Sequence, residues 1–261
     1  MFELALYEAK NRVKGGIYLS IGLSILAAFV IWAYPSFSEA FEDDELLEAY
    51  PEQILQLFDV ETMASLEGFL AFELYVFGWV ILLGLYFAYA CSSMIADDVD
   101  RERMDITLSL PISRSSVVLQ KYLSILVPIT LVNVLTPIVV YVGAIWIDEP
   151  IPAVDLLAIH LLSIPYLLVC AGIGLLASVV FDRASIAQRV ALGVTFGLFM
   201  LESLLVGTDF EAVGVIAPMR YFDPNEILLE GTYNLEGVAI LLVMTAALVG
   251  ASRLWFSRVD I

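Results

Sequence analysis

The stretch that decides the fold is LLAIHLLSIPYLLVCAGIGLLASVVF, Leu156–Phe181, which carries no formal charge along its whole length. A run of roughly 18 or more apolar residues is long enough to cross the hydrocarbon core of a bilayer as a helix. Three more runs share this property, and they are Gly15–Tyr34, Leu74–Ala96 and Tyr122–Ile147. With 61% hydrophobic residues and a mean hydropathy of +0.90, the sequence predicts a membrane protein.

Two weaker apolar runs complete the pattern. Val190–Val206 is interrupted by Glu202, and Gly237–Phe256 contains Arg253 near its end. The alternation of apolar and polar segments favours counting both as spans. We therefore predict an all-α polytopic membrane protein, a single transmembrane domain over residues 1–261, with six helices at about 15–34, 69–96, 118–147, 155–181, 187–206 and 236–256.

Basic residues set the orientation of these spans. If six spans alternate, eleven of the twelve fall on one side and only Arg220 falls opposite. Lys and Arg are retained on the cytoplasmic side, so we place both termini in the cytoplasm of a multi-pass cell-membrane protein. The eleven are Lys10, Arg12, Lys14, Arg101, Arg103, Arg114, Lys121, Arg183, Arg189, Arg253 and Arg258.

Acidic residues show the reverse distribution. The outer segment 35–68 holds ten acids between Glu39 and Glu67 and no base, and the formal net charge of the chain is −18. Such a surface could bind cations, but we interpret it as solvation at high salt. The composition therefore predicts a halophilic, archaeal source.

Several enzyme chemistries are missing from the sequence. There is no GxxxxGK[ST] motif for nucleotide hydrolysis, no GxSxG elbow, and a single histidine, His160, which excludes an HExxH zinc site. We expect His160 in an interfacial role at the outer start of the fourth span. Cys91 and Cys170 fall inside spans and indicate buried small residues rather than a disulfide framework. The chain is therefore predicted to be non-catalytic and to bind no cofactor.

Two segments outside the spans have helical patterns. Residues 1–14 place Phe2, Leu6, Ala9 and Val13 on one stripe, which predicts a short helix in the inner membrane interface. The segment between the fifth and sixth spans is too apolar for a solvated loop and too broken by prolines to span. We expect a pair of short outer helices there, either dipping into the outer leaflet or forming an exposed cap.

Three polar side chains inside or near the spans are candidates for a translocation path. An intramembrane carboxylate is a functional candidate by default, and Glu73 and Glu202 are the acids nearest the hydrocarbon. Both lie near the outer boundary, so a polar edge is the alternative. Asn133, bracketed by Pro128 and Pro137, is expected to bond a neighbouring helix where the prolines bend the third span.

The charged stretch RERMDITLSLPISR, Arg101–Arg114, interrupts the chain between the second and third spans. Read as a helix over 97–111, it carries two apolar stripes on opposite faces, one of Val99, Ile106 and Leu110, the other of Met104 and Leu108. An interfacial helix needs only one such face. Two faces indicate contact with the membrane domain on one side and with a second protein on the other, whereas a solvated connecting loop is the alternative.

The segment ERMDITLSLPISRSSVVLQK resembles the cytoplasmic loop of permease subunits of type-two ABC transporters, the export class. The ending L-P-[VI]-S-R of that pattern matches residues 110–114, and Thr107, Leu108 and Lys121 also match, whereas Ile106 replaces the usual glycine. APMRYFDPNEIL before the last span and the C-terminal residues 258–261 look similar too. The resemblance implies an ATPase-coupling set of Glu102, Arg103, Ile106, Thr107, Leu108, Leu110, Pro111 and Arg114.

The resemblance also implies an assembly. Such a subunit pairs with a second permease copy, here as a homodimer, and docks two cytoplasmic ATPase subunits through this loop, called the coupling helix. ATP and Mg then bind on the ATPase, and the bilayer is the only other partner expected, with no nucleic acid. The substrate and an extracellular accessory protein are left open. A non-transporting scaffold or signalling subunit that docks an ATPase is the alternative function.

The predicted topology can be tested by labelling single cysteines from one side of the membrane, on a background that lacks Cys91 and Cys170. The eleven-to-one distribution of bases places Ser113 and Ser185 in the cytoplasm, and Asp43 and Asn225 outside. Labelling of a cysteine at position 113 from outside would overturn the orientation.

Overall fold

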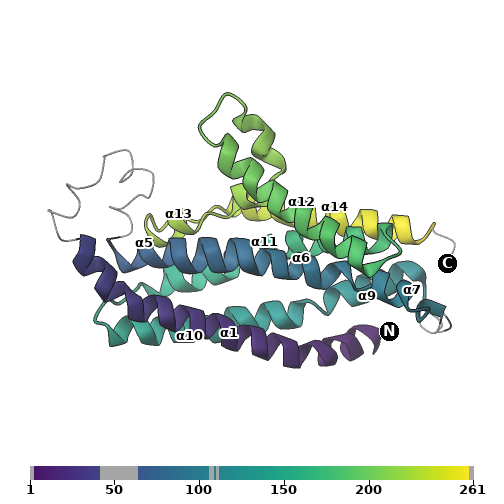
Figure 1. The fold of residues 1–261 in the computed structure, drawn as a ribbon, viewed down its shortest axis with the longest axis horizontal. Helices are drawn as coiled ribbons and strands as arrows, with labels where there is room; N and C mark the ends of the chain where they lie inside the picture. Colours follow the sequence, from purple (N-terminus) through teal and green to yellow (C-terminus); the bar gives the residue numbers. More distant parts are fainter. Residues whose placement is uncertain (1–2, 42–63, 106–108, 110–111, 259–261) are drawn as a thin grey trace.

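The computed structural model describes residues 3–41, 64–105, 109 and 112–258 (Figure 1). Regular secondary structure in these residues is entirely helical, which confirms the predicted all-α polytopic fold. The helices are α1 (Glu3–Phe41), α5 (Leu66–Leu70), η1 (Ala71–Leu83), α6 (Gly84–Ser92), α7 (Ala96–Asp100), α9 (Arg114–Leu123), α10 (Leu126–Trp146), α11 (Ala153–Val180), α12 (Ala184–Leu205), η2 (Glu211–Ile216), η3 (Pro218–Tyr221), α13 (Pro224–Leu228) and α14 (Leu235–Phe256).

Six helical stretches of the described chain are long and apolar enough to cross a membrane. They are Glu3–Ser38, Leu66–Asp100, Arg114–Trp146, Ala153–Val180, Ala184–Leu205 and Leu235–Phe256. In Figure 1 the N-terminal and C-terminal ends of the chain lie at one end of the bundle, near α7 and α9, while α5 and α13 lie at the other. Both termini lie at the same end because the number of spans is even. We call the two ends the termini end and the opposite end.

The N-terminal segment differs from the prediction of a separate interfacial helix over 1–14. Residues from Glu3 onward continue into the first span as one helix of 39 residues. At 1.5 Å per residue this helix is about 58 Å long, so it is longer than the roughly 30 Å hydrocarbon core of a bilayer. The physical reason is that nothing between Lys14 and Gly16 breaks the helix, since a glycine pair costs only about 1 kcal/mol per residue.

The second span is built from α5, η1 and α6 in direct succession. Residues 71–83 take wide π-helical turns, for which the sequence has no signal. The helix predicted over 97–111 is not continuous in the structure. α7 ends at Asp100, and Glu102 has a left-handed φ of +54°. Residues 106–108, 110 and 111 lie outside the described part of the chain.

The third span bends where its first proline requires it. α9 ends at Leu123 and α10 begins at Leu126. Pro128 lacks the N–H that the carbonyl of Ser124 would accept in a continuous helix, and its ring would clash with that carbonyl. Pro137, in contrast, is accommodated inside α10.

α11 occupies the centre of the bundle, and small residues allow α6 to approach it. A Cβ on Gly174 would overlap the backbone carbonyl oxygen of Ala88, and one on Gly84 would meet the Tyr166 ring. Cys91 and Cys170 are free thiols buried at this contact, as predicted. Close packing of small residues is a main source of helix association in membranes, where no hydrophobic effect acts between helices.

The predicted short helices between the fifth and sixth spans are η2, η3 and α13, and in Figure 1 α13 lies at the opposite end whereas the segment that follows α12 projects from the side of the bundle. η2 leaves Val213, Val215 and Ile216 about half exposed, whereas Pro218 on η3 and Ile227 on α13 are buried against the bundle. The segment is therefore partly a cap and partly packed. Most of the acidic segment 35–68, from 42 to 63, lies outside the described residues. That this segment is solvated at high salt therefore stays a prediction.

The contact between α6 and α11 predicts opposite effects for the same substitution at two glycines. Gly174→Ala forces a methyl group against the Ala88 carbonyl, and overpacking of this kind typically costs about 1–3 kcal/mol. Gly193→Ala on α12 meets no atom within 4 Å, so the higher helix propensity of alanine should leave stability unchanged or raise it. Thermal stability of the detergent-solubilised variants, followed by size exclusion, is the measurement. Equal stability of the two variants would contradict the packing.

Candidate functional site

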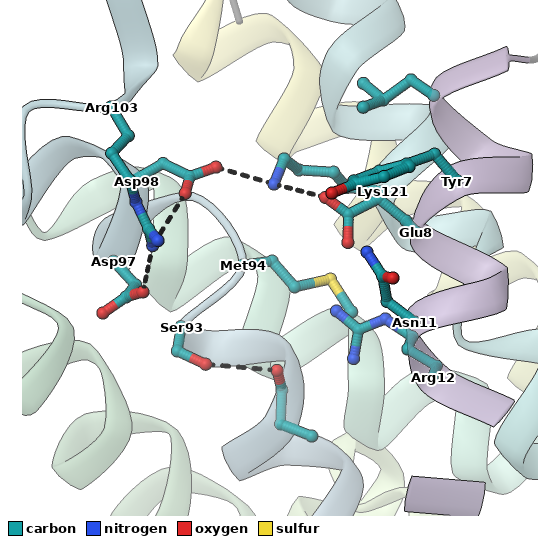
Figure 2. A pocket seen from close by; sticks show the side chains of 12 residues that line it. Tyr7, Glu8, Asn11, Arg12, Ser93, Met94, Asp97, Asp98, Arg103 and Lys121 are labelled. Carbon is teal, nitrogen blue, oxygen red and sulfur yellow. Dashed lines mark hydrogen bonds and ion pairs between the residues drawn. The ribbon is translucent and has the colours of Figure 1, made fainter. Parts of the chain in front are cut away.

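The most polar buried group of side chains at the termini end surrounds Lys121 (Figure 2). It is built from three elements, since Glu8 lies on α1, Asp97 and Asp98 lie on α7, and Lys121 lies in the last turn of α9. Only 7% of the Lys121 side chain is exposed. Buried charges are tolerated when they are paired, and this lysine is paired twice.

The ion pairs form a chain across these elements. Lys121 Nζ lies 3.0 Å from Glu8 Oε1 and 2.7 Å from Asp98 Oδ2. Asp98 Oδ1 is 3.2 Å from Arg103 Nη2, and the same guanidinium nitrogen is 2.6 Å from Asp97 Oδ2. Exposure increases along this chain, to 49% for the Arg103 side chain. The ion pairs of Lys121 therefore contribute more to stability than those of Arg103, because exposed ion pairs typically contribute under about 1 kcal/mol.

The start of α7 is fixed by a side chain of α11. Ser178 Oγ accepts hydrogen bonds from the backbone N–H groups of Ile95, at 2.8 Å, and Ala96, at 3.0 Å. Backbone N–H groups at a helix start have no partner within the helix, so this contact satisfies two of them. It also joins the end of the second span to the centre of the bundle.

The end of α7 has the geometry of a Schellman C-cap. The backbone N–H of Arg103 donates to the carbonyl of Asp98 at 2.7 Å, and that of Glu102 donates to Val99 at 3.0 Å. Glu102 therefore occupies the left-handed position that glycine usually takes. This turn ends the helix and directs Arg103 back towards the acids of α7.

A polar cavity of about 510 Å³ lies beside this cluster. In Figure 2 Asn11 and Arg12 of α1 line one wall, and Asp97, Asp98 and Arg103 line the facing one. Arg12 is anchored by its Nε, which donates to Ser124 Oγ at 2.8 Å. The full lining consists of Leu4, Tyr7, Glu8, Asn11, Arg12, Ala90, Ser93, Met94, Asp97, Asp98, Arg103 and Lys121.

The structure places part of the predicted ATPase-coupling set. Glu102 and Arg103 follow α7, and Arg114 begins α9 behind the Ser113 cap. The prediction placed Val99 and Met104 on opposite faces of one helix. In the structure both pack into the same hydrophobic core, because the helix ends before Glu102. The others, Ile106, Thr107, Leu108, Leu110 and Pro111, lie outside the described residues.

Asn133 makes the predicted bond to a neighbouring helix and belongs to a buried polar network. Its Oδ1 lies 3.1 Å from His160 Nδ1 and accepts from Ser163 Oγ at 3.0 Å, and both partners are on α11. His160 Nε2 lies 3.2 Å from the Tyr75 hydroxyl of η1. His160 is only 2% exposed, so the expected interfacial role is wrong. The helical register points it inward, and α10, α11 and η1 are joined through it.

The three candidate translocation residues lie in separate environments. Asn133 is in the network above, whereas Glu73 is half buried on η1. Glu202 is 5% exposed at the end of α12, with Arg220 Nη1 at 3.6 Å from its Oε1 and the backbone of Gly214 against its carboxylate. Arg220 also binds Glu211, with Nη2 at 2.9 Å from Oε1. This arrangement favours the polar-edge interpretation of Glu202.

Sequence analysis missed the acids that surround Lys121. In the sequence nothing distinguishes Glu8, Asp97 and Asp98 from other charged residues that flank spans. Likewise, nothing distinguishes Ser178 from the other small residues of the fourth span. A signal was present in Lys121 itself, since the chain has only three lysines and this one adjoins a long apolar run. Ionisable residues beside the hydrocarbon commonly pair with one another, so acids near this lysine could have been sought.

The described residues contain six helical stretches long and apolar enough to span a membrane, and a cluster of charged side chains lies at the end that carries both termini. The chain belongs to the ABC-2 transporter family, because the model described as "ABC-2 family transporter protein" matches residues 3–261. It is therefore a permease component of an ABC transporter, and in this family that component is generally non-catalytic. The search of the curated proteins finds no match.

The ion pair between Arg220 and Glu202 predicts a loss of stability that depends on whether both residues are present. Arg220→Met leaves the Glu202 carboxylate buried without its cation, and we expect a loss of about 3 kcal/mol, the low end for breaking a buried pair, because Arg220 is partly exposed. In a Glu202→Gln background the same substitution should cost clearly less. Unfolding of the four variants in detergent gives the coupling energy. Equal costs in both backgrounds would show that the pair contributes nothing.

Proposed function

We propose that this chain is the permease subunit of an ATP-driven exporter and that its segment 97–114 docks a separate cytoplasmic ABC ATPase. The observation that carries the proposal is the Lys121-centred cluster, which ties the start of this segment to two other spans. A surface that receives force from a partner needs such attachments, because a loosely held loop would move without moving the helices behind it.

The ends of the segment support this role. Its first helix, α7, is held by Ser178 at its N-terminal side, and the segment leads into α9, whose first turn is capped by Ser113. The predicted orientation places the termini end, with eleven of the twelve bases, in the cytoplasm where an ATPase is found. The family resemblance of residues 102–121 supports the same assignment.

The assembly we propose contains two permease copies and two ATPase subunits, with ATP and Mg bound on the ATPase. Large apolar side chains remain exposed on α1, α12 and α14, among them Trp32, Phe196 and Leu254. Lipid and a second copy are the two surroundings that suit such side chains. Export as the direction rests on the resemblance alone, and a non-transporting scaffold would show the same docking without substrate movement.

Truncation of the apolar docking residues tests the proposal. If docking buries both leucine side chains, each one removed in Leu108→Ala/Leu110→Ala is worth roughly 1.5–3 kcal/mol, so affinity for the ATPase should fall by about two orders of magnitude or more. Glu102→Lys should have a smaller effect, because exposed ion pairs contribute little. The measurement is retention of a co-expressed ABC ATPase subunit on the purified permease.

A matched control has the same kind of truncation at the C-terminal end of α12. Leu204→Ala/Val206→Ala removes two exposed apolar side chains there and should leave ATPase retention unchanged. If the Leu108/Leu110 variant retains the ATPase like the wild type, the segment is a connector and the docking proposal fails. Retention by the wild type without ATP-dependent substrate movement in liposomes would favour the scaffold function.

A further inference from the structure

Three polar contacts attach the N-terminal part of α1 to α9 and the turn that follows it. The backbone N–H of Ala5 donates to Gln120 Oε1 at 3.2 Å, Glu8 pairs with Lys121 at 3.0 Å, and Arg12 Nε donates to Ser124 Oγ. Spacings of three and four residues place Ala5, Glu8 and Arg12 on one face of α1. The N-terminal turns of α1 are therefore held along that face against α9 and the turn that follows it.

Lys121 is the member of this set that also reaches α7. Its Nζ is 2.7 Å from Asp98 Oδ2 on one side and 3.0 Å from Glu8 Oε1 on the other. An ammonium group has three donors and can bind both carboxylates at once. Without it, Glu8 and Asp98 would face each other as like charges, which repel in a poorly solvated site. In the described part of the chain, Lys121 Nζ thus links a carboxylate of α1 to a carboxylate of α7.

The two attachments of α7 lie at different points along it. Ser178 binds the backbone at Ile95 and Ala96, and Lys121 binds the side chain of Asp98. A force on the segment after Asp100 would therefore turn α7 about its Ser178-held start and displace Asp98. The cavity of about 510 Å³ between α1 and α7 leaves room for such a displacement.

We propose that Lys121 is a positioning residue that transmits movement of the ATPase-docking segment to α1. This rests on the proposed function, because the movement comes from an ATPase bound to segment 97–114. A residue with a purely structural role would hold the helices together in every state, and its removal would lower stability. A transmitting residue makes the position of α1 depend on the nucleotide state of the partner.

The test measures the distance between spin labels on α1 and α14 at the termini end, at Val13 and Leu254, which are both exposed. The permease is purified with its co-expressed ATPase and compared without nucleotide and after trapping with ATP and vanadate. We expect a nucleotide-dependent distance change in the wild type, its loss in Lys121→Met, and its recovery in Lys121→Arg, which keeps the charge.

Glu8→Gln provides a second, milder variant in case Lys121→Met does not fold. It leaves at most a neutral hydrogen bond on the α1 side of the connection and should reduce or abolish the distance change, whereas Glu3→Gln, at an exposed acid on the same helix, should leave the change at its full size. A wild type that binds ATPase but shows no change, or a Lys121→Met or Glu8→Gln variant that keeps the change at its full size, would overturn this inference. Failure of the wild type to bind the ATPase would instead overturn the proposed function.

Discussion

The close approach of α6 to α11 is the constraint on which the rest of the structure depends. Apolar surface gives no net attraction between helices in a bilayer, so a central helix must be held by tight contact and by hydrogen bonds. Gly174 provides the contact with Ala88, and the Tyr166 hydroxyl donates to the carbonyl of Val80 at 2.8 Å. Once α11 is central, Ser178 is placed to bind the start of α7.

Three buried or partly buried polar clusters each join helices that apolar packing alone would not hold together. His160 joins η1, α10 and α11 in the interior, Arg220 holds η2 and η3 over the end of α12, and Lys121 joins α1, α7 and α9 at the termini end. Asn133 and His160 border a cavity whose other lining side chains are mostly apolar, whereas the Lys121 cluster borders a cavity lined by several charged side chains, next to the charged segment 97–114. That difference is why we assign the interior network to packing and the Lys121 cluster to coupling.

The six spans could be predicted because hydrophobic length is a property of single segments. Long uncharged runs such as Leu156–Phe181 need no partner to be recognised, and the family match agrees with the motif at residues 110–114. What could not be predicted depends on register between distant segments. Whether His160 faces lipid or Tyr75, and whether Lys121 meets Glu8, is decided by helix packing. The turn at Glu102 was missed because a glutamate rarely takes a left-handed conformation.

The central claim is that the chain meets its ATPase at the segment between α7 and α9. A photo-crosslinking amino acid at position 109, within that segment, tests it most directly, with position 208, just after α12, as the comparison. The account predicts a crosslink to the co-expressed ATPase from position 109 and none from position 208. A complex that retains its ATPase but crosslinks from position 208, or from neither position, would contradict it.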